Sequence, residues 1–112
     1  MIAITFEEHG DVIVFNIAGE FFIESVEFAE KTWNQIVQKN PRVVGINCRE
    51  IKFIDSSAIG VLVKFLNNSS KLNIQLIFFD LNDTILNVFK TAKLGNFFTI
   101  LDKEQFQYQY LK

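Results

Sequence analysis

The chain has 112 residues, a length that suits one domain with one hydrophobic core. Apolar residues make up 49% of it and charged residues 21%, as in ordinary soluble globular proteins, and the net charge is −2. Lysines and arginines are scattered without a basic stripe, so the composition argues against direct nucleic-acid binding. No apolar run approaches the roughly 18 residues of a membrane span, so no membrane insertion is expected.

Targeting, redox and metal signals are weak. The N-terminal residues lack the basic region of a signal peptide, and Cys48, the only cysteine, cannot form a disulfide within the chain. Both features predict a reducing, cytoplasmic location. His9 is the only histidine, so no spacing closes a zinc site. We expect His9 to be a solvated turn residue, Cys48 a small core residue, and the protein to use no metal and no cofactor.

The predicted elements begin with a hairpin. Apolar residues alternate with polar or small ones over residues 2–8, which predicts a half-buried strand. A turn follows at 9–11, and residues 12–18 predict the second strand. Residues 19–20 are expected to end this strand, and residues 21–23 to form an apolar loop.

The middle of the chain predicts a helix, a strand and a second helix. Apolar residues recur at helical spacing over 24–39, and Asn40-Pro41 is expected to stop that helix. The β-branched run 43–48 predicts a central strand, and 49–54 a connection. The second helix is expected over 57–71. Its polar face comprises Gly60, Lys64, Asn67 and Lys71.

The last third of the chain predicts a strand at 74–79, a helix at 84–92 and a short strand at 97–100. The tail from Asp102 is ambiguous, because its aromatic residues alternate as in a strand while its length and charge also suit a short helix. After the opening hairpin, strands alternate with helices. This order predicts an α/β domain with a mostly parallel sheet and right-handed crossovers.

Residues able to act in catalysis form no recognised pattern. Ser56 and Ser57 are nucleophiles in principle, but the G-x-S-x-G elbow is absent and a triad would have to recruit His9. Glycine-rich phosphate loops are also missing. Carboxylates such as those of Asp80 and Asp83 are interpreted as surface and capping groups. We therefore predict no catalytic residue.

The cluster Asp55-Ser56-Ser57 ends a short apolar run and stands directly before an apolar-periodic segment. Such a cluster is typical of a helix N-terminus, because short oxygen-bearing side chains accept hydrogen bonds from the first unpaired backbone N–H groups. On the residues alone, two interpretations stay open. Asp55 and Ser56 are either a structural cap, worth about 1 kcal/mol, or part of a functional surface.

The stretch Phe53-Ile54-Asp55-Ser56-Ser57-Ala58-Ile59-Gly60-Val61-Leu62 resembles the signature of the STAS family, in particular that of the bacterial anti-sigma-factor antagonists. That signature is an apolar pair, Asp-Ser-Ser or Asp-Ser-Thr, a small residue, an aliphatic residue and Gly. The resemblance extends to Gly19-Glu20, to the strand at 43–48 and to the ending at 88–98. It implies a single STAS-like α/β domain over 1–112, with a mixed, mostly parallel sheet of about five strands and three to four helices mainly on one side.

The resemblance also implies a protein that is not an enzyme. Such proteins bind a serine-kinase anti-sigma factor and thereby release a sigma factor. The kinase phosphorylates the first Ser after the Asp, which maps to Ser56; the phosphorylated form no longer holds the kinase, and a phosphatase resets it. We expect the partner-binding surface to comprise Asp55, Ser56, Ser57, Gly60, Lys64, Glu20, Phe21 and Phe22.

Phe22 departs from the family pattern. The family often has Gly-Glu/Asp-aliphatic-Asp after the second strand, and the last Asp is implicated in kinase recognition. Here the stretch is Gly19-Glu20-Phe21-Phe22, so Phe22 stands at the Asp position. The two phenylalanines are either a core plug or an exposed apolar contact. The alternative function is a constitutive STAS interaction subunit of a lipid-transport or multi-domain signalling complex.

Overall fold

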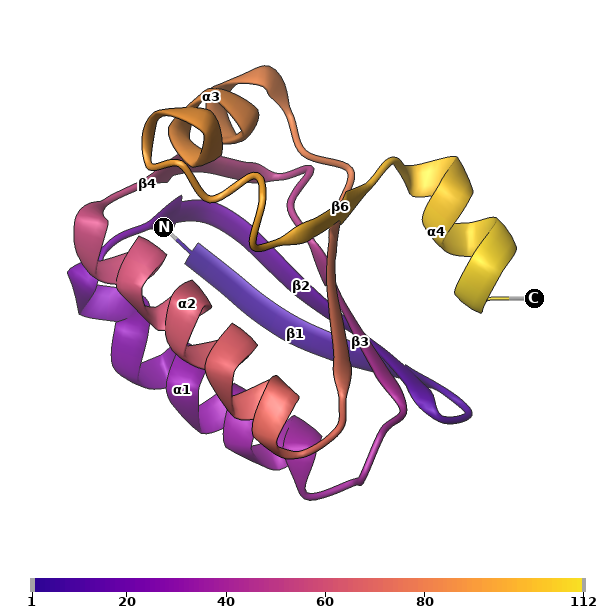
Figure 1. The fold of residues 1–112 in the computed structure, drawn as a ribbon. Helices are drawn as coiled ribbons and strands as arrows, with labels where there is room; N and C mark the ends of the chain where they lie inside the picture. The colour runs from indigo at the N-terminus through magenta and orange to yellow at the C-terminus, as the bar shows by residue number, and fades with distance from the viewer. Residues whose placement is uncertain (1, 112) are drawn as a thin grey trace.

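The computed structural model describes residues 2–111, and its strands and helices alternate along most of the chain (Figure 1). In chain order the elements are β1 (Ile2–His9), β2 (Val12–Phe21), α1 (Ile23–Val37), β3 (Val43–Asn47), β4 (Ile51–Ile54), α2 (Ser56–Lys71), β5 (Gln75–Phe79), α3 (Asp83–Thr91), β6 (Thr99–Leu101) and α4 (Lys103–Tyr110).

The sheet is mixed and mostly parallel, as predicted. Its strands follow the order β1-β2-β3-β5-β6, and β4 pairs with the far end of β2. The β1–β2 pair is antiparallel, whereas β2–β3, β2–β4, β3–β5 and β5–β6 are parallel. Gly10, at φ +66°, lies in the hairpin turn, where a left-handed backbone conformation favours glycine. The sheet thus has six strands, against the five or so expected.

Two apolar clusters cover the two faces of the sheet. On one face, Ile13, Phe15 and Ile17 of β2 pack in a large core with buried residues of α1, α2 and α3. On the other face, Val12 and Val14 of β2 belong to a smaller cluster that α4 covers. This alternation is the period-2 pattern of a strand buried on both faces. The prediction that the helices lie mainly on one side is confirmed, with α4 as the exception.

Phe106 anchors α4 to the sheet. Its side chain is completely buried, and its ring stacks on Phe79 with centroids 4.1 Å apart and an interplanar angle of 2°. The ring also lies directly over Gly45 of β3, where a Cβ atom would overlap it. Gly45 is therefore required by packing. The helical interpretation of the tail is confirmed, and Asp102 starts α4 with a capping box formed with Gln105.

Three predictions between the second strand and the second helix are wrong. Strand β2 does not end at 19–20 but continues through a register shift between Gly19 and Glu20, where it changes partner from β3 to β4. Residues 21–23 form no loop, because Phe21 ends β2 and Ile23 begins α1. The expected connection 49–54 contains β4, which the bulged end of β2 supplies with a parallel partner.

Candidate functional site

The side chain of Asp55 caps two helices at once. One carboxylate oxygen, Oδ1, accepts a hydrogen bond from the backbone N–H of Ala58, 2.9 Å away, and so caps α2. The other, Oδ2, accepts from the backbone N–H of Ile23, also at 2.9 Å, at the start of α1. Phe22, the N-cap residue of α1, makes no side-chain cap bond itself. A single carboxylate therefore fixes both helix starts at the same edge of the sheet (Figure 1).

Ser56 is the first residue of α2 and is exposed. Within residues 2–111 its hydroxyl makes no hydrogen bond, so no contact inside this part of the chain occupies it. The N-terminus of a helix carries a partial positive charge and unpaired N–H groups, which suit an anion. The two residues therefore differ in role. Asp55 is the structural cap of the helices, whereas Ser56 faces solvent and is the residue available to a functional surface.

The predicted partner-binding residues differ in exposure. Ser56, Gly60, Lys64 and Glu20 are exposed, whereas Asp55, Ser57 and Phe22 are partly buried. Phe21 is 0% exposed and belongs to the large core, so the expectation that it contacts a partner is wrong. From its position in β2, the side chain of Phe21 faces the large core that α1, α2 and α3 cover. Of the two phenylalanines, Phe21 is the core plug and Phe22 remains partly accessible.

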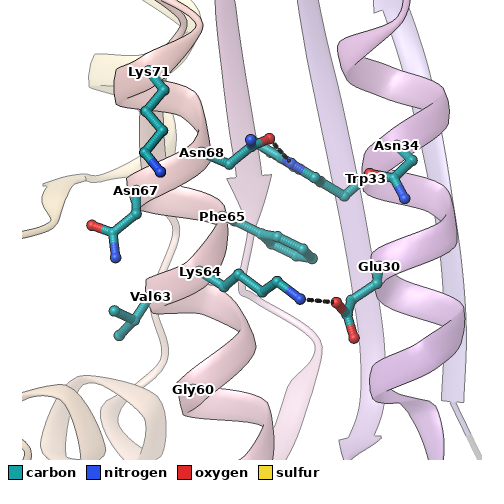
Figure 2. Close-up of a pocket in the computed structure, with 10 residues that line it drawn as sticks. All are labelled: Glu30, Trp33, Asn34, Gly60, Val63, Lys64, Phe65, Asn67, Asn68 and Lys71. Atoms are coloured by element: carbon teal, nitrogen blue, oxygen red, sulfur yellow. Dashed lines mark hydrogen bonds and ion pairs between the residues drawn. The ribbon is translucent and has the colours of Figure 1, made fainter.

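The predicted polar face of α2 is exposed throughout. Gly60, Lys64, Asn67 and Lys71 are among the residues that line a groove of about 550 Å³ beside α1. Lys64 reaches toward α1, whereas the side chains of Asn67 and Lys71 lie on the side of α2 away from α1 (Figure 2). Across this groove the Nζ atom of Lys64 lies 2.6 Å from a carboxylate oxygen of Glu30. The sequence-based prediction missed the α1 side of this groove, because the pairing of α1 with α2 is a tertiary contact. The polar residues Glu30 and Asn34 on α1 were the available signal.

Ile23 is an apolar residue of the site that the sequence-based prediction placed in a loop. It is 63% exposed at the first position of α1, next to the Asp55 carboxylate that accepts from its N–H. The only local sign in the sequence that Ile23 begins the helix was its place as an apolar residue directly before Glu24. Its closeness to Asp55, 32 positions away in sequence, is a property of the fold.

Among residues 2–111, the remaining titratable groups form no second site. Cys48 is fully buried, which raises the pKa of its thiol far above the ordinary value, and the charge of Asp80 adds to this. The core position predicted for Cys48 is thus confirmed. His9 is exposed at the end of β1. Residues 2–111 contain no group of three or more His, Cys, Asp and Glu placed to hold a metal ion, and no helix among them is long and apolar enough to span a bilayer.

Comparison with known proteins identifies the family to which a chain with this fold and this helix start at Asp55-Ser56 belongs. Residues 3–106 match the family model of the STAS domain, and the chain belongs to the STAS family. No curated protein sequence matches the chain.

Solved structures share the fold at low sequence identity. A candidate anti-sigma factor antagonist from Thermotoga maritima aligns with a TM-score of 0.86 and 18% identity, over 97% of this chain and 95% of that one. SpoIIAA, a Bacillus cell fate determinant solved in its phosphorylated form, aligns with a TM-score of 0.71 and 21% identity, over 92% and 95%. A sulfate transporter family protein from Wolinella succinogenes aligns with a TM-score of 0.69 and 18% identity, over 81% and 76%.

Proposed function

We propose that residues 1–112 act as a single STAS domain, an anti-sigma-factor antagonist that binds a serine-kinase anti-sigma factor and so releases a sigma factor. Phosphorylation of Ser56 by that kinase ends the interaction, and a phosphatase acting on phosphorylated Ser56 restores it. The observation that carries the proposal is the exposed Ser56 at the first position of α2, directly after a capping Asp55. The fold shared with proteins described as anti-sigma factor antagonists supports it.

The chemistry of the helix start supports Ser56 as a switch. A phosphoryl group adds about −1.5 to −2 charges at neutral pH. The free N–H groups and dipole of α2 favour such a charge, so we expect the fold to persist. Both oxygens of the neighbouring Asp55 carboxylate are already engaged in caps, and its negative charge repels the added group. The effect therefore falls on whatever docks at Ser56, through bulk and like-charge repulsion.

The proposed docking surface comprises the accessible residues around this helix start, namely Asp55, Ser56, Ser57, Gly60, Lys64, Glu20 and Phe22, with Ile23 added. The proposed role is that of a cytoplasmic regulator of transcription by partner switching. It involves no enzymatic activity, no direct contact with nucleic acid and no insertion into a membrane.

The experiment is a co-purification from native cells followed by phosphorylation in vitro. We expect recovery of a serine-protein kinase that modifies wild-type protein on Ser56, as read by mass spectrometry, and that leaves Ser56→Ala unmodified. Ser70→Ala is the matched control, because Ser70 is exposed at the opposite end of the same helix. Equal modification of wild type and Ser56→Ala, or recovery of no kinase and no sigma-type partner, contradicts the proposal.

A second candidate is a constitutive STAS interaction subunit of a lipid-transport or multi-domain signalling complex. The likeness to a sulfate transporter family protein favours it, as does Phe22 at the position where the antagonists often carry Asp. In that case the co-purified partner is a membrane or multi-domain assembly. No phosphorylated Ser56 is then found in protein taken from the cells.

A further inference from the structure

Strand β1 forms a long, regular edge of the sheet (Figure 1). It has eight residues and pairs, among the described strands, with β2 alone, so one side of its backbone presents N–H and C=O groups to no other strand. The other edge strands, β4 and β6, have only four and three residues. Proteins commonly protect a long edge with a lysine, a proline or a bulge, and β1 contains none of these.

The charged residues of β1 lie at one end of the strand. The segment Ile2–Phe6 is uncharged, whereas Glu7 and Glu8 follow it. Two such strands pair antiparallel without opposing charges when residues 2–6 of one copy face residues 6–2 of the other, a register centred on Ile4. Registers centred on Glu7 or Glu8 place like charges opposite each other, which is destabilising. The sequence of β1 therefore favours one self-pairing register.

The apolar surface of β1 continues onto α1. Ile2 and Phe6 are partly buried, on the face of the sheet that α1 covers. Phe6 borders a small hollow together with Gln35 and Lys39. Phe28 lies seven residues before Gln35, on the same side of α1, and is 51% exposed. An exposed aromatic ring thus lies on the side of α1 that faces the free edge of the sheet.

The charges on this side of α1 complement themselves. Glu24 lies in the first turn and borders a hollow with Phe28, whereas Lys39 lies just beyond the helix end, four residues after Gln35. In an antiparallel pair of α1 helices related by a two-fold axis, Glu24 faces Lys39 of the second copy and Phe28 faces Gln35. Lys39 also pairs with Glu8 at 3.4 Å, an exposed contact of little energetic weight.

We propose that two copies of this chain associate through β1, paired antiparallel about Ile4, so that the sheet continues from one copy into the other. The two α1 helices then pack side by side across the two-fold axis and cover Phe28. The inference goes beyond the proposed function and does not depend on it. The opposite side of α1 carries Glu30, which pairs with Lys64 of α2, so the dimer leaves Ser56 accessible.

Sedimentation velocity of the full chain over a concentration series tests the dimer. We expect reversible dimerisation, which Phe28→Glu weakens about 10-fold or more, because it removes the aromatic contact and places a charge in the interface. Phe97→Glu is the matched control, since Phe97 is 70% exposed between α3 and β6, and it is expected to dimerise as the wild type does. Circular dichroism checks the folding of both variants. A monomer at every concentration, or equal dimerisation of Phe28→Glu and wild type, overturns the proposal.

Disulfide cross-linking tests the register. In pairing centred on Ile4, residue 3 of one copy lies opposite residue 5 of the other, with Cβ atoms about 4.5–5.5 Å apart. A mixture of Ala3→Cys and Thr5→Cys proteins is expected to cross-link in far higher yield than either protein alone, and Cys48 is fully buried and does not interfere. Equal yields overturn the proposed strand pairing. Ser56→Ala is expected to dimerise normally, so failure of a kinase to modify Ser56 is a separate outcome.

Discussion

Replacing Asp55 with Ala is expected to lower the free energy of unfolding by about 2–4 kcal/mol, because two helices lose their cap together. The carboxylate accepts from the N–H of Ala58 in α2 and from that of Ile23 in α1. Urea unfolding followed by circular dichroism measures the effect. Asp55→Asn is expected to fall between wild type and Asp55→Ala, because a carboxamide has only one oxygen to accept with.

Asp102→Ala is the matched control for this prediction. Asp102 caps one helix, α4, by accepting from the N–H of Gln105 at 2.7 Å. Its loss is expected to cost about 1 kcal/mol. If Asp55→Ala and Asp102→Ala destabilise the protein equally, the second hydrogen bond of Asp55, from the N–H of Ile23, adds no stability, and other contacts hold the start of α1 beside Ser56.

Replacing Phe106 with Ala is expected to lower the free energy of unfolding by about 3–5 kcal/mol, the usual cost of removing a fully buried aromatic ring. The ring stacks on Phe79 and fills the space over Gly45. Chemical denaturation measures this cost. Phe106 is the one fully buried side chain that α4 contributes among the described residues, so its loss also weakens the packing of α4 on the sheet, where Tyr110 still contacts the same cluster.

A double mutant tests whether the contact between the ring of Phe106 and Gly45 itself stabilises the protein, as distinct from the presence of α4 in general. Gly45→Ala alone is expected to cost about 1–3 kcal/mol, because its Cβ overlaps the ring of Phe106. In the Phe106→Ala background the overlap is gone, so the same substitution is expected to cost nearly nothing. Additive costs of the two substitutions would show that Gly45 is required for a reason other than the ring.

The sequence predicts those features that depend on local pattern. Alternation over residues 2–8 and helical spacing in α1 and α2 locate elements to within a residue or two, because burial on one face imposes those periods. The helix start at Asp55 was predictable for the same reason, since its bond to Ala58 is only three positions long. These patterns also sufficed for the order of the elements from β1 to β6 except β4, and they left the tail that forms α4 ambiguous.

The features that escaped prediction depend on tertiary contacts. Strand β4 has four residues, and Lys52 and Phe53 within it are exposed, so no alternation marks it. Its partner is the end of β2 beyond a register shift that no local pattern indicates. The second hydrogen bond of Asp55 joins residues 32 positions apart, and the groove needs α1 and α2 side by side.

We expect the charge of a phosphoryl group on Ser56 to decide whether a partner stays bound at the start of α2. The direct measurement is the affinity of the co-purified serine-kinase anti-sigma factor for unphosphorylated protein and for protein phosphorylated on Ser56, by isothermal titration calorimetry. Circular dichroism of both forms serves as the control for folding. We predict that the phosphorylated form stays folded and binds at least 100-fold more weakly. Equal affinity of the two folded forms would contradict the account.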